Sequence, residues 1–407
     1  MVGRHSIDDY QGDSAERASE EPKSEKFAAL ESCRGICALL VALVHLSANG
    51  YFYNLLPVRN GGLGVTYFFV LSGFVMMHAY GRKLSSIDDL VPFAVRRIGR
   101  LYPLHIAMLL ALFLLECVKL IIVSRSTLAA GVPAFSGANS YSALLGGVLL
   151  INGLGFFRDF TWNGPSWTIS TELWTYLIFF VVVMRKNSAP LIALLLVAGS
   201  GAALALNEAL GAPLKTIRGQ GAILCVYCFF IGVLSHSMVR PRFPSLGTNR
   251  FIEIFSAAAA CATFFDVIPM KTILNPLIFA LLVIVLSGKS SRCARILDKR
   301  PLVYLGKISY SIYMVHFAVG TVLNAAARVI QAKTSTQILK QGVGESGFLI
   351  DTGHRWQMDA LALVYLFIVI AIAGLTYRTI EVPFRDKLNR FSARLEAKRR
   401  AQAAGAV

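Results

Sequence analysis

The sequence is poor in charged residues. Only 15% of its 407 residues are Asp, Glu, Lys or Arg, whereas 55% are hydrophobic and the mean hydropathy is +0.59. Soluble domains carry about 25% charged residues, so this composition excludes an ordinary soluble fold. It predicts an all-α polytopic membrane protein, with spans of about 20 residues each.

Acidic residues are the scarcer of the two charged classes. The chain has 40 Lys and Arg against 23 Asp and Glu, which gives a formal net charge of +17. In a soluble protein this excess would indicate nucleic-acid binding. Here the basic residues cluster between apolar segments, as the positive-inside rule describes, and we expect no nucleic-acid partner.

An apolar run is absent from residues 1–26, where acids and bases alternate. This excludes a secretory signal peptide. We expect 1–26 to be a disordered cytoplasmic extension and the first apolar segment to be a retained membrane anchor.

Cysteines are few, and the positions of the seven do not suggest a disulfide framework. Cys225-x-x-Cys228 has the spacing of a redox or metal site, but no second pair or His cluster accompanies it. Buried free thiols behave as small hydrophobic groups. We therefore expect packing thiols, no metal site and no permanently bound cofactor.

Eleven apolar segments are candidate spans: 27–47, 61–80, 102–123, 142–157, 167–184, 189–208, 219–239, 251–268, 273–287, 303–330 and 359–380. If all eleven crossed, the basic stretches 240–250, 289–300 and the tail from Arg385 would lie outside, against the positive-inside rule. If the short, Gly- and Asn-rich segment 142–157 is not counted as a crossing, all three basic stretches lie in the cytoplasm. We predict about ten transmembrane helices in the cell (inner) membrane, both termini cytoplasmic, with 142–157 re-entrant or interfacial.

Three connecting segments have distinct characters. Residues 82–100 are predicted to form a basic cytoplasmic loop, and 331–358 the longest outer loop, Gly-rich and lid-like. In the basic cytoplasmic tail, 384–407, apolar side chains recur at helical spacing opposite basic ones, which predicts an interfacial helix. The membrane domain itself is predicted to cover 27–383.

The first span carries two polar side chains, Arg34 and His45. They are 45 − 34 = 11 residues apart, almost three helical turns, so they share a face at about 16 Å along the axis. Polar groups inside a span are energetically costly and usually functional. The pair predicts a polar track that crosses much of the bilayer.

A second basic group, Arg96-Arg97-x-x-Arg100-x-x-Pro103, precedes the third span. Proline favours a first helical turn, so we expect the arginines at or just before a helix N-terminus. Guanidinium groups there would make an anion site. The alternative is ordinary positive-inside charge.

Two further segments place polar groups within apolar runs. The segment 162–176 puts Trp167, Ser170 and Glu172 at the outer end of a span, although its tryptophans could be a simple aromatic belt. In the segment 305–316, the residues Ser309, Tyr313 and His316 share a helix face. For His316 the alternative is a structural histidine. His78, His105 and His236 lie near span ends and are interpreted as interfacial.

Together these motifs resemble the membrane-bound acyltransferase-3 family, from about Lys26 to Pro383. The likeness is carried by Arg34 with His45, GVTYFFVLSGF at 64–74, Arg97-x-x-Arg100, Trp167-x-x-Ser170-x-Glu172, LGKISYSIYMVH at 305–316 and Glu381-x-Pro383. The resemblance implies O-acylation of a sugar, lipid or antibiotic, an essential Arg–His pair, and handling of acyl-CoA by the basic segment after the second span. It does not account for residues 1–26.

The residues and the resemblance together predict an integral membrane O-acyltransferase. Cytoplasmic acyl-CoA, with acetyl-CoA expected, would donate to a hydroxyl of an exported or lipid-linked glycan. His45 is expected to be the general base, with Glu172 orienting it or binding the acceptor. Arg34, Arg97 and Arg100 would bind the donor. Substrate contacts are expected from Trp167, Ser170, Ser309, Tyr313 and His316. The alternative is a secondary transporter, although the sequence shows no internal repeat.

Overall fold

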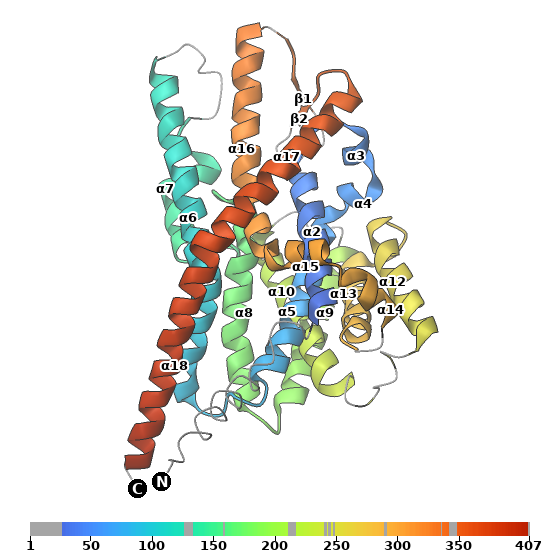
Figure 1. Ribbon diagram of the computed structural model, residues 1–407, viewed down its shortest axis with the longest axis vertical. Coiled ribbons are helices and arrows are strands. Elements are labelled where there is room, and N and C mark those ends of the chain that lie inside the picture. The colour runs from blue at the N-terminus through green and yellow to red at the C-terminus, as the bar shows by residue number, and fades with distance from the viewer. Residues whose placement is uncertain are drawn as a thin grey trace, which may run out of the picture.

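The computed structural model describes residues 27–405, except for 126–132, 158, 211–216, 240–241, 243–245, 247–248, 289–290, 335 and 342–347. The predictions for residues 1–26 and for most of the basic stretch 240–250 therefore lie outside the described residues. Helices dominate the described part, and the strands β1 (Leu339–Gln341) and β2 (Phe348–Ile350) pair as a short antiparallel ribbon. Figure 1 shows the helices arranged as one bundle.

The described residues contain eight helices that are long and apolar enough to cross a membrane. They are α2 (Ala28–Leu46), α5 (Gly64–Tyr80), α6 (Leu90–Arg125), α8 (Trp167–Met184), α9 (Ala189–Ala209), α10 (Ile217–Leu234), α16 (Ser309–Thr334) and α17 (Arg355–Thr376), which continues into α18 (Val382–Gly405). This confirms an all-α polytopic membrane protein.

The other two predicted spans form a shorter hairpin. Helix α12 (Arg250–Phe264) has 15 residues and α13 (Lys271–Leu286) has 16, and the two pack against each other. At about 1.5 Å per residue they are 22–24 Å long, less than the roughly 30 Å of a hydrocarbon core. Ten helices thus match the ten predicted spans, eight of them at full length.

The segment 142–157 forms no helix long enough to cross a membrane. Helix α7 (Tyr141–Val148) has eight residues, or about 12 Å, and irregular chain follows it to η6 (Gly164–Ser166). Its backbone is held by protein: the Ser170 hydroxyl donates to the carbonyl of Leu150 at 2.6 Å and accepts from the amide of Gly153 at 3.1 Å. Irregular backbone at membrane depth requires such internal partners.

The prediction of a loop at 82–100 was wrong. After the short turn η4 (Ile87–Asp89), helix α6 runs unbroken from Leu90 to Arg125, with Pro103 well inside it. Arg96, Arg97 and Arg100 therefore lie in the first half of a 36-residue helix and not at a helix N-terminus. The side chains of this half are instead available to the bundle and to α18, which packs along it.

The basic tail forms helix α18, joined to α17 by the π-helical turn η9 (Tyr377–Glu381). It runs beside α6 (Figure 1), where Arg96 and Glu396 form a salt bridge at 2.9 Å and Arg399 pairs with Asp89 at 3.3 Å. Its position at a membrane surface stays a prediction.

The segment after α2 connects to the β ribbon. Ser47 ends α2 in the left-handed conformation (φ 52°), and α3 (Tyr51–Asn54), α4 (Leu56–Arg59) and η3 (Gly61–Leu63) follow. The amide of Ile350 donates to the carbonyl of Ser47 at 3.0 Å, and the amide of Asn49 donates to Ile350 at 2.9 Å. The described parts of the predicted outer loop are thus attached to the chain just beyond His45.

The core depends on a close crossing of α5 and α10. A Cβ added to Gly73 would overlap the carbonyl oxygen of Phe229, and one added to Gly232 would overlap that of Val70. Small residues permit such approaches between membrane helices.

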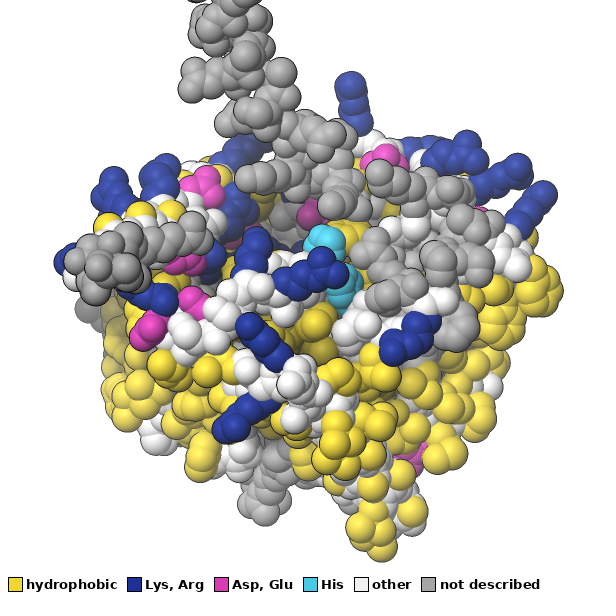
Figure 2. Space-filling view, turned by 90° about the horizontal axis from the view of Figure 1, so that it is seen from below, with side chains coloured by type: hydrophobic (Ala, Val, Ile, Leu, Met, Phe, Trp, Pro, Cys, Tyr) yellow, Lys and Arg dark blue, Asp and Glu magenta, His cyan; other side chains and the backbone are white. Residues whose placement is uncertain are grey.

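The flanks of the bundle are apolar, and one end is basic. Leu191 and Leu195 on α9 and Phe367 on α17 are more than half exposed, which suits lipid contact and would be unfavourable in water. Figure 2 looks at the end where α18 terminates and shows Lys and Arg side chains gathered there, with hydrophobic side chains around the sides. Smaller helices α14 (Arg292–Leu297) and α15 (Arg300–Lys307), with η5 (Gly137–Asn139) and the π-helical η7 (Ser235–Val239), complete the described elements.

Candidate functional site

Arg34 lies in a cavity within the bundle. Helix α15 crosses α2 very closely, since a Cβ on Gly35 would lie 2.7 Å from the amide of Gly306. This crossing brings the start of α16 to the face of α2 that carries Arg34. The cavity has a volume of about 70 Å³ and is lined by Arg34, Val65, Phe68, Phe69, Thr168, Ile169, Glu172, Ser309, Tyr310 and Tyr313. We call it the arginine cavity.

Glu172 is one wall of the arginine cavity, and its carboxylate has two hydroxyl donors. Tyr176, one turn later on α8, donates to it at 2.5 Å, and Ser72 of α5 donates to the same oxygen. Buried carboxylates need such donors, because leaving them unpaired is costly. The interpretation of Glu172 as more than a surface charge is supported by this placement.

The basic group on α6 reaches the same region. Arg97 donates to the Tyr80 hydroxyl at 2.9 Å, and its guanidinium lies 5.0 Å from the ring centre of Tyr80 and 5.8 Å from that of Tyr176. Arg100 lies within electrostatic range of Arg34. Arg96, by contrast, pairs with Glu396 on α18. Three neighbouring arginines therefore have three different environments.

Glu381 completes the charge cluster and was given no role from the sequence. It is 4% exposed in the π-helical turn η9, accepts a hydrogen bond from Ser311 at 2.8 Å, and interacts electrostatically with Arg100 and Arg34. A single acid near the end of an apolar run, before Pro383, was the available signal. Only the fold shows that it faces arginines distant in sequence.

His45 and His316 lie together. Their ring centroids are 4.9 Å apart, and the ring of Phe317 lies 6.4 Å from that of His45. Nδ1 of His45 is 2.7 Å from the carbonyl of Val41, and Nδ1 of His316 is 3.2 Å from that of Ile312. A carbonyl only accepts, so Nδ1 carries the proton in both neutral rings and Nε2 is the basic nitrogen. The sequence did not predict this pairing.

Tyr313 joins the histidine pair to the arginine cavity. Its ring lies 5.7 Å from that of His316 and 5.8 Å from that of Phe68. Thr168 donates to its hydroxyl at 3.1 Å. Ser309, one turn earlier, also lines the cavity, and its buried hydroxyl has no partner among the described residues. The predicted shared face of Ser309, Tyr313 and His316 is confirmed.

Other predicted residues lie nearby or serve the fold. Trp167 packs its ring 6.1 Å from that of Phe69 and lines a second cavity. Ser170 lines neither cavity and bonds the backbone at 150–153. His105 is fully buried and contacts the carbonyl of Gly147 at 2.9 Å, so its interfacial interpretation was wrong.

The cysteines do not form a site within the described chain. Cys225 and Cys228 are free and fully buried, which confirms packing thiols. Among the described residues, no group of three or more His, Cys, Asp or Glu is arranged to hold a metal ion.

Comparison with known proteins identifies the family. The acyltransferase-3 model, described as an acyltransferase domain, matches residues 27–375. Acyltransferase MdmB of Streptomyces mycarofaciens is 26% identical over 405 residues, which cover 91% of this chain and 94% of that protein. The putative peptidoglycan O-acetyltransferase YrhL of Bacillus subtilis is 27% identical over 320 residues, covering 71% of this chain but about half (48%) of that protein.

No solved structure matches the chain significantly. The family match nevertheless covers the first span with Arg34 and His45, the arginines of α6, Glu172 on α8 and His316 on α16. These are the residues that the fold assembles around the arginine cavity and the histidine pair. The chain belongs to the acyltransferase-3 family and is a membrane enzyme that transfers acyl groups.

Proposed function

We propose that this enzyme transfers an acyl group, most simply acetyl, from acyl-CoA to a hydroxyl of an exported or lipid-linked glycan. The observation that carries the proposal is the line of half-buried and buried polar groups through the bundle. It begins with the arginines of α6, passes Arg34 and Glu172, and ends at His45 and His316. A relative named as a peptidoglycan O-acetyltransferase supports a glycan acceptor.

The donor would bind at the basic end. CoA carries a pyrophosphate, which planar guanidinium groups bind with two parallel hydrogen bonds. Arg100 and Arg97 have the right chemistry, and Arg34 lies further along the same path. We place this end in the cytoplasm, in accordance with the positive-inside rule, because Lys and Arg gather there (Figure 2).

The acceptor hydroxyl must lose a proton as it attacks the thioester carbonyl. His45 would accept it at Nε2, because Nδ1–H already donates to Val41. The new ester bond forms as the carbon–sulfur bond breaks, and the CoA thiolate leaves and takes up a proton. Arg34 and the hydroxyls of Ser309 and Tyr313 line the space beside this path.

Glu172 would hold the donor side in place. Its carboxylate fixes Tyr176 and Ser72, and the ring of Tyr176 faces the Arg97 guanidinium. Glu381 would do the same for Arg100 and Arg34 from the opposite helix. The carboxylates of Glu172 and Glu381 flank the arginines and keep them oriented. Two carboxylates do not neutralise all three guanidinium groups.

A thioester assay tests the donor half. Protein purified in lipid nanodiscs is incubated with acetyl-CoA, and released thiol is measured with and without a glycan extract. Acceptor-dependent thiol release is expected. The proposal would be refuted if well-folded protein neither released thiol nor bound acetyl-CoA. Mass spectrometry of glycans from a deletion strain, compared with its parent, tests the acceptor half: a missing acetyl mass is expected.

A further inference from the structure

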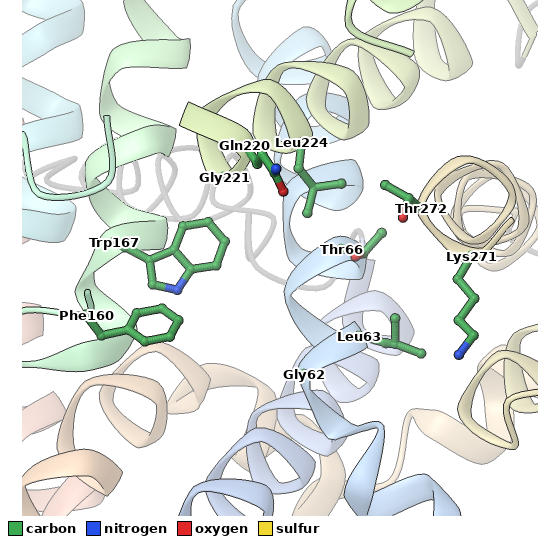
Figure 3. A pocket seen from close by; sticks show the side chains of 10 residues that line it. All are labelled: Gly62, Leu63, Thr66, Phe160, Trp167, Gln220, Gly221, Leu224, Lys271 and Thr272. Atoms are coloured by element: carbon green, nitrogen blue, oxygen red, sulfur yellow. The ribbon is translucent and has the colours of Figure 1, made fainter. Parts of the chain in front are cut away.

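A second cavity, about 240 Å³ in volume, lies where four helices begin. Gly62, Leu63 and Thr66 border it from η3 and α5, Phe160 from the chain before η6, Trp167 from the start of α8, Gln220, Gly221 and Leu224 from α10, and Lys271 and Thr272 from α13. Figure 3 shows these side chains around one space. Helices α5 and α8 end at the basic side of the bundle, so the cavity belongs to the opposite side.

One aromatic contact separates this cavity from the arginine cavity. Phe69 lines the arginine cavity, Trp167 lines the second one, and their ring centroids are 6.1 Å apart. Neighbouring residues on the same helices, Thr66 and Thr168, face opposite sides of this boundary. A molecule in the second cavity is therefore separated by this one contact from the cavity that Arg34 and Glu172 line.

Two buried polar atoms in this cavity lack a partner within the described chain. They are Oε1 of Gln220 and Oγ1 of Thr272. The amide nitrogen of Gln220 is occupied, because it donates to Asn207 at 3.0 Å. The amide is thereby oriented with its oxygen as the remaining acceptor. Buried groups of this kind are normally paired, and an unmade bond is costly.

The charge in the cavity is already balanced. Lys271 forms a salt bridge with Asp266, and the other lining side chains are neutral. The walls are otherwise apolar or aromatic: Trp167, Phe160, Leu63 and Leu224. The space therefore favours an uncharged molecule with apolar faces and a few hydroxyl groups at its edge.

We propose that the second cavity binds one neutral sugar ring of the acceptor; this inference rests on the proposed function. A pyranose has carbon–hydrogen faces that pack on aromatic rings and a rim of hydroxyls. One hydroxyl donates to Oε1 of Gln220, and another exchanges a hydrogen bond with Thr272. The volume is below the roughly 300–1,000 Å³ of pockets for drug-sized ligands, which fits one ring and not a long glycan segment.

Trp167 then has two functions in the same place. Its ring packs against the sugar, and its contact with Phe69 forms the boundary that the acceptor hydroxyl must pass to reach the arginine cavity. Glycine at position 221 makes room for this ring, because a Cβ there would lie 2.8 Å from Trp167. Gln220 and Thr272 determine which sugar edge faces inward.

Direct binding tests the assignment. Saturation-transfer NMR and titration calorimetry are performed on nanodisc-embedded protein with chitotetraose and maltotetraose as neutral sugars. We expect at least one to bind. Thr272→Val keeps the shape but removes the hydroxyl, and Gln220→Leu removes the acceptor. Each should weaken binding roughly three- to tenfold, the value of one hydrogen bond.

The matched control is Thr263→Val on the neighbouring helix α12, where the hydroxyl donates to the carbonyl of Ala260. This variant should bind sugar normally. The inference would be overturned if neither sugar bound, or if Thr272→Val bound sugar as tightly as the parent protein. Acetyl-CoA thiol release is measured in parallel. If thiol release occurs without sugar binding, only this inference fails. If sugar binds but the protein neither releases thiol nor binds acetyl-CoA, only the proposed function is refuted.

Discussion

The rings of His45 on α2 and His316 on α16 lie 4.9 Å apart, and both direct Nδ1 to a carbonyl one turn earlier on their own helix. Both Nε2 atoms are therefore the basic ones. In the proposed reaction, Nε2 of His45 would take the proton from the acceptor hydroxyl.

Replacing the base should abolish turnover without unfolding the protein. His45→Gln retains a side-chain donor for Val41 but has no basic nitrogen. We expect acyl transfer to fall by about 10²–10⁴, with acetyl-CoA binding unchanged. His105→Gln is the control, because His105 is buried against the carbonyl of Gly147 and lies outside the proposed chemistry. Near-normal transfer by His45→Gln would leave Glu172 or His316 as the base.

Donor binding should depend on the shape of the α6 guanidinium groups as well as on their charge. Arg100→Lys and Arg97→Lys keep the charge but lose the planar fork. A charge-assisted hydrogen bond contributes about 1.5–3 kcal/mol, so each change should weaken acetyl-CoA binding roughly ten- to hundredfold, measured by calorimetry. Arg96→Lys, whose side chain pairs with Glu396, should bind normally. Equal affinity in all three would make these arginines topology signals only.

The α5–α10 crossing should tolerate no added methyl group. Gly73→Ala would force Cβ into the carbonyl of Phe229, and overpacking of this kind costs about 1–3 kcal/mol. We expect a lower thermal midpoint in nanodiscs. Gly320→Ala on α16, where a Cβ would meet no atom within 4 Å, is the matched control. A midpoint that is the same for both variants would show that the helices can separate at little cost.

Much of the fold follows from the sequence because membrane spans obey simple constraints. Length, hydropathy and the distribution of Lys and Arg predicted the helices and singled out 142–157 as a segment that does not cross. They failed at Leu90–Arg125, where the basic residues continue the helix. Proline lacks an N–H, but it is tolerated inside membrane helices when neighbours supply partners. The charge of residues 82–100 favours a loop, although residues 90–100 continue the helix.

The site was predictable residue by residue but not as a constellation. Arg34, His45, Glu172 and His316 stand out because polar groups in apolar runs are rare. Their partners do not stand out. Ser72 and Tyr176 are ordinary span residues, and Glu381 comes within electrostatic range of Arg100 only in the folded chain. The unpaired atoms of Gln220 and Thr272 are visible only after helices α10 and α13 are placed.

The attachment of the β ribbon beside His45 should weaken in acid. Asp351 accepts from the amide of Gly353 at 2.7 Å, from Asn49 at 3.1 Å and from Lys340 at 3.0 Å. Partial burial acts to raise the pKa of this carboxyl, but the three donors together hold that pKa below its ordinary value. A lowered folded pKa means that the unfolded or detached segment binds protons more tightly.

The sign of the effect follows from that pKa. The stabilisation is fully present above the unfolded pKa of Asp, about 3.9, and is lost as pH falls through the lower folded value. Hydrogen exchange, corrected for the intrinsic rate at each pH, should show faster opening of Asn49 and Ile350 amides below about pH 4. Asp351→Asn cannot ionise, so its corrected opening should be faster at neutral pH and nearly independent of pH. Asp359→Asn is the control variant, because the Asp359 carboxylate accepts from the amide of Phe52 instead. If protection of Ile350 stayed constant down to pH 3 in the parent protein, the carboxylate would not hold the ribbon, and the backbone bonds to Ser47 and Asn49 alone would suffice.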